Sequence, residues 1–237
     1  MAGQRRWTFE EVVLAVGLYC ELPFGQFHRR NPEVLAMAQR LDRTPSSVAM
    51  KLCNLASLDP GHQRRGVSGL TNASALDREV WELFHGDWGV AFERLDRGRH
   101  PDETERRVER VERRGQEFFR RAVLTAYGGR CCVTGIEIPS LLVAGHISPW
   151  SQDAINRLNP RNGLCMAWTQ ERAFDKGLWT LDEDLRVMIS PELSARRGSE
   201  GLEDNFLKYE GRAITLPDRF EPDPTLLAWH RERCFVR

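Results

Sequence analysis

The stretch LLVAGHISPW, residues 141–150, decides how the second half of the chain is interpreted, because it ends an apolar run at His146 and then turns through a Pro-Trp pair. An apolar run of this length is typical of a buried strand. An imidazole at the strand end is either a structural histidine with a satisfied hydrogen bond or a base close to neutral pH. Taken alone, the structural interpretation is the commoner one, so the surrounding motifs have to decide.

Composition sets the first bounds. The 237 residues include 34 basic and 34 acidic side chains, so the net charge predicts no partner. Any surface for nucleic acid has to be a local patch rather than a field over the whole protein. The length exceeds that of a typical single domain and predicts one large domain or two modest ones.

The apolar runs and the cysteines indicate a compartment. No run approaches the roughly 20 residues that span a bilayer, and the start, MAGQRRWTFEE, has no signal-peptide core. The six cysteines form no C-x-x-C pair, so no structural zinc is expected. Free thiols fit a reducing compartment. We therefore expect a cytoplasmic protein that makes no contact with a membrane.

Residues 1–95 show helical patterns and are predicted to form one helical domain. The segment 8–21 opens on a capping box and repeats apolar residues at helical spacing. Further helices are predicted over 32–41, from Pro45 onward and over 74–95. The first three resemble a helix-turn-helix arrangement, and an ordinary helical bundle is an equally good interpretation.

A helix-turn-helix domain would contact DNA through polar side chains on its third helix and on the loop that follows. The predicted DNA-binding residues are Arg43, Ser46, Ser47, Lys51, Asn54, Arg64 and Arg65, with Arg161 from the second half of the chain.

The segment 96–121 is dense in charge and poor in apolar residues, which predicts a solvated linker helix. From residue 122 to 237 the pattern is mixed. A helix stopped by Gly128-Gly129 is followed by a short strand before Gly135.

The rest of this second domain is predicted to contain a strand over 140–147, a polar loop, a helix over 164–177 and a hairpin over 178–190. Its tryptophans are expected in the core. The fold class predicted for the whole chain is α+β.

Three motifs in this second domain contain groups suited to phosphodiester hydrolysis. That reaction needs an activated water and a cation at the departing oxygen. A neutral imidazole at His146 is a natural base, and the loop residue Asn162 could fix its orientation. The following helix bears Gln170, Glu171 and Asp175, whose oxygen atoms are the hard ligands that Mg²⁺ prefers.

The motifs that contain these residues, GHISPW, NPRNGL and AFDKGL, occur in the order and at the separations of a known family. The stretch that includes them resembles the HNH endonucleases with the ββα-metal fold. More narrowly, it resembles the bacterial restriction-endonuclease-like branch that lacks zinc cysteines. The flanks RTPSSVAMKL and FLKYEGRAITLPDRFEPDP also resemble full-length members, so the similarity spans most of the chain.

By that resemblance, His146 would activate the attacking water, and Asn162 would orient it or contribute to the metal site. The family's third signature residue is a histidine metal ligand in a pattern resembling LHDRAFD. This chain reads TQERAFD, with Gln170 in that place. Either Gln170 offers a carbonyl oxygen to the metal, or Glu171 brings an anionic ligand together with Asp175 one turn later. Local capping or pairing is the alternative role for Asp175.

The resemblance implies a Mg²⁺- or Mn²⁺-dependent restriction endonuclease that cuts double-stranded DNA, with base-modified DNA as one candidate substrate. Because each site would cut one strand, a homodimer is expected. The alternative is a weakened or inactive HNH-fold protein that binds DNA. The sequence shows no identifiable pocket for a base.

Overall fold

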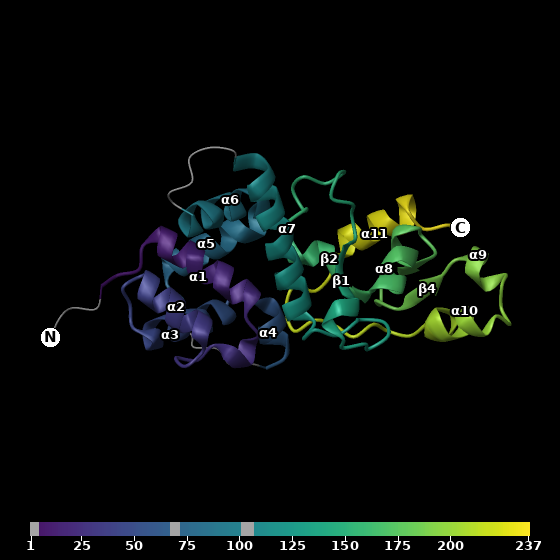
Figure 1. Ribbon diagram of the computed structural model, residues 1–237, viewed down its shortest axis with the longest axis horizontal. Coiled ribbons are helices and arrows are strands. Elements are labelled where there is room, and N and C mark those ends of the chain that lie inside the picture. The colour runs from purple at the N-terminus through teal and green to yellow at the C-terminus, as the bar shows by residue number, and fades with distance from the viewer. Residues whose placement is uncertain (1–4, 67–71, 101–106) are drawn as a thin grey trace. The chain divides into compact units, whose positions relative to one another are not determined.

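The computed structural model describes residues 5–66, 72–100 and 107–237. The chain divides into two compact units between Thr125 and Ala126. The first unit is helical, and the second combines helices with two-stranded sheets over its described residues (Figure 1). The fold class is therefore α+β, as predicted.

Three described helices of the first unit pack against its first helix. The elements over the described residues are α1 (Phe9–Glu21), η1 (Phe24–Gln26), α2 (Pro32–Arg40), α3 (Pro45–Ala56), α4 (Pro60–Arg64), α5 (Ala75–Gly86), α6 (Trp88–Arg99) and α7 (Arg107–Ala126). Helix α1 packs against α3, α5 and α6. Its capping box forms as the sequence predicts, with Thr8 and Glu11 each accepting a hydrogen bond from the other's backbone N–H.

The helix predicted over 74–95 is two helices, α5 and α6, because the chain leaves helical geometry at Asp87. That residue is extended, with φ at −152°, and ends α5. Its carboxylate then accepts a hydrogen bond from the backbone of Val90 and so caps α6. The break spans a single residue, too short for apolar periodicity to reveal it.

The segment 96–121 belongs to the first unit rather than to a solvated linker. Its first residues complete α6, the positions 101–106 lie outside the described residues, and the remainder forms most of α7. Phe118 and Phe119 of α7 are both 2% exposed.

Helix α7 is held to α6 by an aromatic contact and an ion pair. The ring centroids of Phe118 and Phe92 are 5.3 Å apart, and Arg114 donates two hydrogen bonds, of 2.6 and 2.9 Å, to Asp96. A few apolar residues on one face are thus enough to bury one side of a charge-rich helix.

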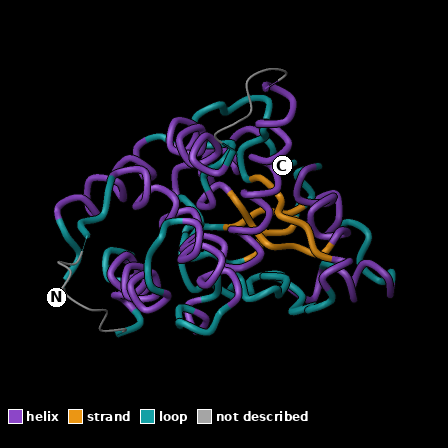
Figure 2. Tube along the Cα trace, turned by 60° about the vertical axis from the view of Figure 1, so that its left-hand side comes forward, coloured by secondary structure: helices purple, strands orange, loops and turns teal. Residues whose placement is uncertain are grey.

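The second unit is organised around two strands and the helix that follows them. Strand β1 (Leu142–His146) pairs antiparallel with β2 (Gly163–Ala167), which places His146 opposite Gly163. Helix α8 (Trp168–Asp175) begins directly after β2 and packs on both strands (Figures 1 and 2). The strand predicted over 140–147 is therefore confirmed as β1.

Two predictions for this region are wrong. The helix expected over 164–177 is helical only from Trp168, because the buried residues of β2 pair with β1 instead. A short apolar run does not distinguish a strand from a buried helix. The short strand expected before Gly135 is a turn, in which Cys131 N donates to Ile136 O and Cys132 N donates to Cys165 O.

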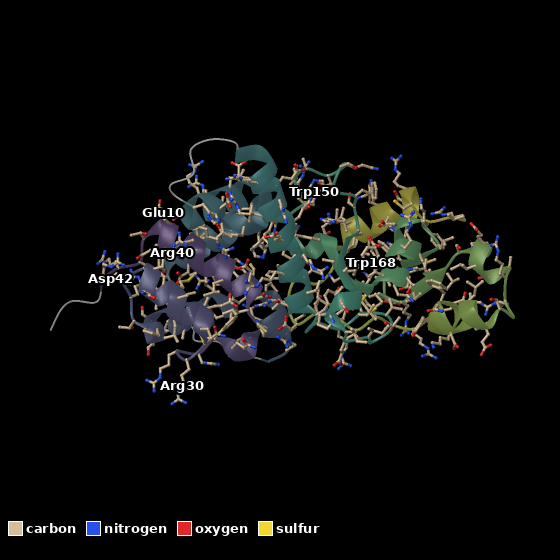
Figure 3. All side chains as sticks on the ribbon, viewed as in Figure 1. Glu10, Arg30, Arg40, Asp42, Trp150 and Trp168 are labelled. Atoms are coloured by element: carbon tan, nitrogen blue, oxygen red, sulfur yellow. The ribbon has the colours of Figure 1, made fainter. Side chains whose placement is uncertain are left out.

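The remaining described elements complete the second unit. They are η2 (Pro139–Leu141), η3 (Pro160–Asn162), β3 (Trp179–Leu181), β4 (Val187–Ile189), α9 (Pro191–Ser194), α10 (Glu200–Asn205), η4 (Leu207–Tyr209) and α11 (Pro224–Arg233). The predicted hairpin is confirmed as β3 and β4. Trp179 lies in the core at 1% exposure, whereas Trp168, also expected there, is 60% exposed at the start of α8 (Figure 3).

Gly177 lets α11 close against α8. It has a φ of +67°, the left-handed conformation that commonly ends a helix. A side chain on Gly177 would collide with the carbonyl oxygen of Cys234, just past the end of α11. None of the described helices is long and apolar enough to cross a membrane.

Candidate active site

His146 is the last residue of β1, and its ring is held in one orientation. The ring Nε2–H donates a 2.9 Å hydrogen bond to the backbone carbonyl of Arg157. The ring also meets Trp150 edge-on, with centroids 5.6 Å apart, on the loop after β1 (Figure 3). Because a carbonyl only accepts, Nε2 bears the proton in the neutral ring. Nδ1 is then the nitrogen with the lone pair.

The surroundings of His146 keep its imidazole neutral. Burial away from water lowers the pKa of His146, and the hydrogen bond to the Arg157 carbonyl only partly opposes this effect. The pKa therefore lies below the ordinary value of 6.5. A ring that is unprotonated at neutral pH is able to accept a proton.

Asn162 is fully buried, and both ends of its amide are engaged. Its Oδ1 accepts from Ser148 N at 2.8 Å, and its Nδ2 donates to Ser148 O and Asn156 O, both at 3.1 Å. The amide therefore fastens both ends of the loop between β1 and η3. This loop includes Arg157, the hydrogen-bond partner of His146. The geometry supports a positioning role for Asn162 rather than the predicted metal-ligand role.

A cavity of about 210 Å³ opens beside His146, and helices α8 and α11 contribute much of its wall. It is lined by His146, Ile147, Pro149, Arg172, Asp175, Lys176, His230 and Cys234. The histidine thus shares a solvent-accessible space with one carboxylate and two cationic side chains.

Glu171 and Asp175 form a carboxylate pair on α8, one turn apart. Burial raises the pKa of both groups, and the negative charge of Asp175 raises the pKa of Glu171 further. The positive charge of Arg172 opposes the rise of both pKa values without cancelling it. Asp175 is also the last residue of α8, where the helix dipole disfavours negative charge. A bound cation would offset both the repulsion between the carboxylates and the unfavourable effect of the helix dipole.

The carboxylate pair lies against the same strand as His146. A Cβ built on Gly145 would be 3.0 Å from Cγ of Glu171 and would collide with Cε of Met166. Position 145 precedes the histidine directly, so the absence of a side chain there makes room for Glu171. Asp175 lines the cavity of His146, whereas Glu171 packs at Gly145 and is not among the residues of that cavity.

Gln170 does not join this group. It is 2% exposed, and its Nε2 donates a 2.6 Å hydrogen bond to Asn205 O at the end of α10. Its backbone carbonyl accepts from Trp179 Nε1. Gln170 thus connects α8 to the rest of the unit and is not among the residues that line the cavity of His146.

Arg161 is half-buried and bound within its own unit. Its Nε donates to Glu221 O at 3.2 Å, and its guanidinium is 3.4 Å from Asp223. These bonds attach η3 to the start of α11, while part of the side chain stays accessible.

Two predicted DNA-binding residues of the first unit are buried in ion pairs. Arg43 contacts Glu11 at 2.7 Å and donates to the backbone carbonyls of Arg5 and Arg6. Lys51 contacts the fully buried Asp77 at 2.5 Å. Both cations stabilise the fold, so a direct DNA contact by either is not supported.

The other predicted residues of the first unit are more accessible. Ser46, Arg64 and Arg65 are exposed, and Ser47 and Asn54 are half-buried on α3. Arg65 also contacts the Nδ1 atom of His62 at 2.5 Å.

Several residues of the cavity were not predicted from the sequence. Arg172 and Lys176 flank the predicted carboxylates on α8, and His230 and Cys234 come from the end of the chain. For the first two, the motif AFDKG was an available signal, because Arg172 precedes it and Lys176 is part of it. For α11 no local sequence pattern indicates that it lines this cavity, because its position depends on the tertiary fold.

The donor set fits a hard divalent cation. Within the described residues, no group of three or more His, Cys, Asp or Glu side chains could hold a metal ion. Mg²⁺ keeps several of its waters and needs only one or two protein carboxylates. Glu171 and Asp175 provide two carboxylates one turn apart on α8, and burial raises the pKa of both.

Comparison with known proteins identifies a family over part of the second unit. The family model described as HNH endonuclease matches residues 131–182, the segment that runs from Cys131 to the hairpin and includes His146, Asn162 and α8. No curated protein matches the chain. The family implies nuclease activity on DNA and, in general, use of a divalent metal ion. Residues 131–182 thus match the HNH endonuclease family, the resemblance that the motifs of this segment predicted.

Proposed function

We propose that the chain is a restriction-type endonuclease that hydrolyses DNA phosphodiester bonds with His146 as general base. The observation that supports this most directly is the orientation of the ring, which is held through Nε2 at the edge of a cavity that also contains Asp175. Its lowered pKa keeps the ring in the basic form.

In this mechanism Nδ1 of His146 accepts the proton of the water that attacks the phosphorus. The hydrogen bond from Nε2–H to Arg157 O stabilises the imidazolium that forms, because a carbonyl dipole favours the positive ring. Asn162 acts indirectly, by fastening the loop that presents this carbonyl. Arg172 and Lys176 place positive charge at the cavity, where the phosphodiester would bind.

Glu171 and Asp175 would hold the metal, for which we propose Mg²⁺, with Mn²⁺ as a substitute. When bound, such an ion stabilises negative charge on the departing oxygen. The side chain of Gln170 is bonded to Asn205 and has no part in this assignment.

The proposed oligomeric state follows from the number of strands that one site cuts. A single site cuts one strand, so a double-strand break requires two sites, which a two-fold homodimer would supply. A restriction role would place the protein in the cytoplasm, with double-stranded DNA, base-modified DNA included, as the substrate.

The test incubates purified protein with plasmid DNA and Mg²⁺ or Mn²⁺, beside a His146→Ala control. We expect nicking by the wild type, with the rate lowered by about 10²–10⁴-fold in the variant, since that is the usual contribution of a general base. Both unmodified and base-modified plasmids are used. Equal nicking by wild type and variant, or none by either on any plasmid, would rule out this mechanism.

A second candidate is a DNA-binding protein that has lost efficient cleavage, and the position of Gln170 favours it. The residue that stands in place of the family's ligand histidine is buried and bonded to Asn205. Restored or enhanced cleavage by Gln170→His would indicate a weakened nuclease. Salt-sensitive DNA binding without cleavage in either protein would indicate the second candidate.

A further inference from the structure

The first unit contains a polar groove between its N-terminal arm and one face of α3. The groove has a volume of about 260 Å³ and is lined by Arg5, Arg6, Trp7, Ser47, Met50, Lys51 and Asn54. We propose that this groove, called here the arm groove, binds a nucleotide of DNA. The proposal goes beyond the cleavage site in the second unit and depends on the proposed function only for the choice of DNA.

Asn54 supplies an unsatisfied hydrogen-bond acceptor to the arm groove. Its Oδ1 is buried and has no hydrogen-bond partner among the described residues. Leaving a buried amide oxygen unpaired costs free energy, so such an atom calls for an explanation. A ligand with an N–H donor would satisfy it, and the edge of a nucleobase presents such donors.

Trp7 and Met50 supply the apolar surface that a flat ring needs. The Trp7 ring is held by two cations, with the guanidinium carbon of Arg43 4.2 Å and Nζ of Lys51 4.9 Å from its centroid. Met50 is 55% exposed although it lies on a helix with a well-packed opposite face. Nucleobases stack on aromatic side chains without regard to sequence.

The arm also brings positive charge that the fold does not neutralise. Arg5 pairs with Glu11, whereas Arg6 is exposed and has no ion-pair partner among the residues that the structure describes. A free guanidinium beside an aromatic and an amide suits an anionic phosphate attached to a base.

The groove residues of α3 lie on one helical face, at spacings of three or four residues: Ser47, Met50, Lys51 and Asn54. The helix-turn-helix interpretation assigned Ser47, Lys51 and Asn54 of this face to DNA. The proposal changes the roles of the residues at the arm groove. Arg43 and Lys51 become supports for Trp7, while Arg6 and Asn54 become the contacts. The volume lies just below the range of about 300–1,000 Å³ for small-molecule sites and suits one nucleotide.

The experiment measures DNA binding by the full-length chain without cleavage. Fluorescence anisotropy follows labelled single-stranded DNA, duplex DNA and duplex RNA of mixed sequence, in EDTA and in a His146→Ala background. The variants are Arg6→Ala and Asn54→Leu, with Arg97→Ala as the matched control, because Arg97 is an exposed arginine of α6 that does not line the arm groove. Circular dichroism checks that each variant folds.

We expect Asn54→Leu to weaken DNA binding by roughly 5- to 150-fold, the range for one lost base contact. Arg6→Ala should lower the slope of log K against log salt by about one, as for one lost phosphate contact. The single-stranded and duplex arms show which form of DNA provides the nucleotide.

Binding by both groove variants that matches Arg97→Ala would overturn the proposal. Equal binding of duplex RNA, with the same losses, would overturn the assignment to DNA. Neither result depends on cleavage. Failure of the arm groove is therefore distinguishable from failure of the nuclease site, which the plasmid assay measures on its own.

Discussion

Helices α3 and α8 both bear charged residues that the sequence marked as functional, yet the structure uses them in opposite ways. On α3, Lys51 is paired with a fully buried carboxylate, that of Asp77. On α8, Glu171 and Asp175 are like charges one turn apart, and both have raised pKa values. Charges that neutralise each other stabilise a fold, whereas charges that repel are tolerated when a ligand compensates them. We therefore assign Lys51 to the stability of the fold, and Glu171 and Asp175 to the binding of a ligand.

The largest effect on stability should follow from breaking the pair on α3. Lys51→Ala leaves Asp77 buried and uncompensated, so we expect the free energy of unfolding to fall by about 3–5 kcal/mol. Urea unfolding measures the change. The control Arg97→Ala should alter it by about 0.5 kcal/mol or less. A loss for Lys51→Ala no larger than that of the control would show that the pair does not stabilise the unit.

In the second unit, His230 has hydrogen-bond partners for both ring nitrogens. Like Lys51 on α3, and unlike the carboxylate pair, it should therefore stabilise the fold. His230 stacks on Phe174 with centroids 3.7 Å apart, donates from Nε2 to Phe174 O and accepts from the Thr180 hydroxyl. Burial lowers its pKa from 6.5 to about 4. The folded state therefore favours the neutral ring, and the stability from this group is complete above pH 6.5 and is lost as the pH falls toward 4.

The expected loss is about 3 kcal/mol, since each pKa unit corresponds to about 1.4 kcal/mol. Urea unfolding at a series of pH values between neutral and acidic measures it. His230→Phe should show a flatter dependence on pH than the wild type. An unchanged slope in the variant would assign the acid sensitivity to other groups.

The smallest change in the free energy of unfolding should come from a substitution on α8, and it should be a gain in stability instead of a loss. Asp175→Asn removes the repulsion from Glu171 and a negative charge at the carboxyl end of the helix. We expect it to raise the unfolding free energy by about 0.5 kcal/mol in EDTA. Mg²⁺ should raise the melting temperature of the wild type but not of this variant, because binding to the folded state alone stabilises it.

Thermal melting in EDTA and in Mg²⁺ measures both effects. The matched control is Glu232→Gln, since Glu232 lies in the last turn of α11 and is not among the residues of the cavity. Its response to Mg²⁺ should equal that of the wild type. If Asp175→Asn kept the full response, the carboxylate pair would not be the metal site.

The sequence was most informative where a signal is local. The capping box of α1, the start of α3 at Pro45, the strand that ends at His146 and the hairpin of β3 and β4 were all predicted from neighbouring residues. It was least informative where two structures bury the same apolar run, as in β2, which was predicted as helix. The pairing of β2 with β1 decided that case, and no single segment contains it.

The sequence by itself determined the α+β class, the order of the motifs and the position of His146 at a strand end. Only the tertiary structure decided which polar groups are already paired. It placed Asn162 and Gln170 in internal hydrogen bonds, brought Glu171 beside Gly145, and added residues of α11 to the cavity. The physical reason is that a side chain's type fixes what it can bond, while only the folded chain fixes which partners come within reach.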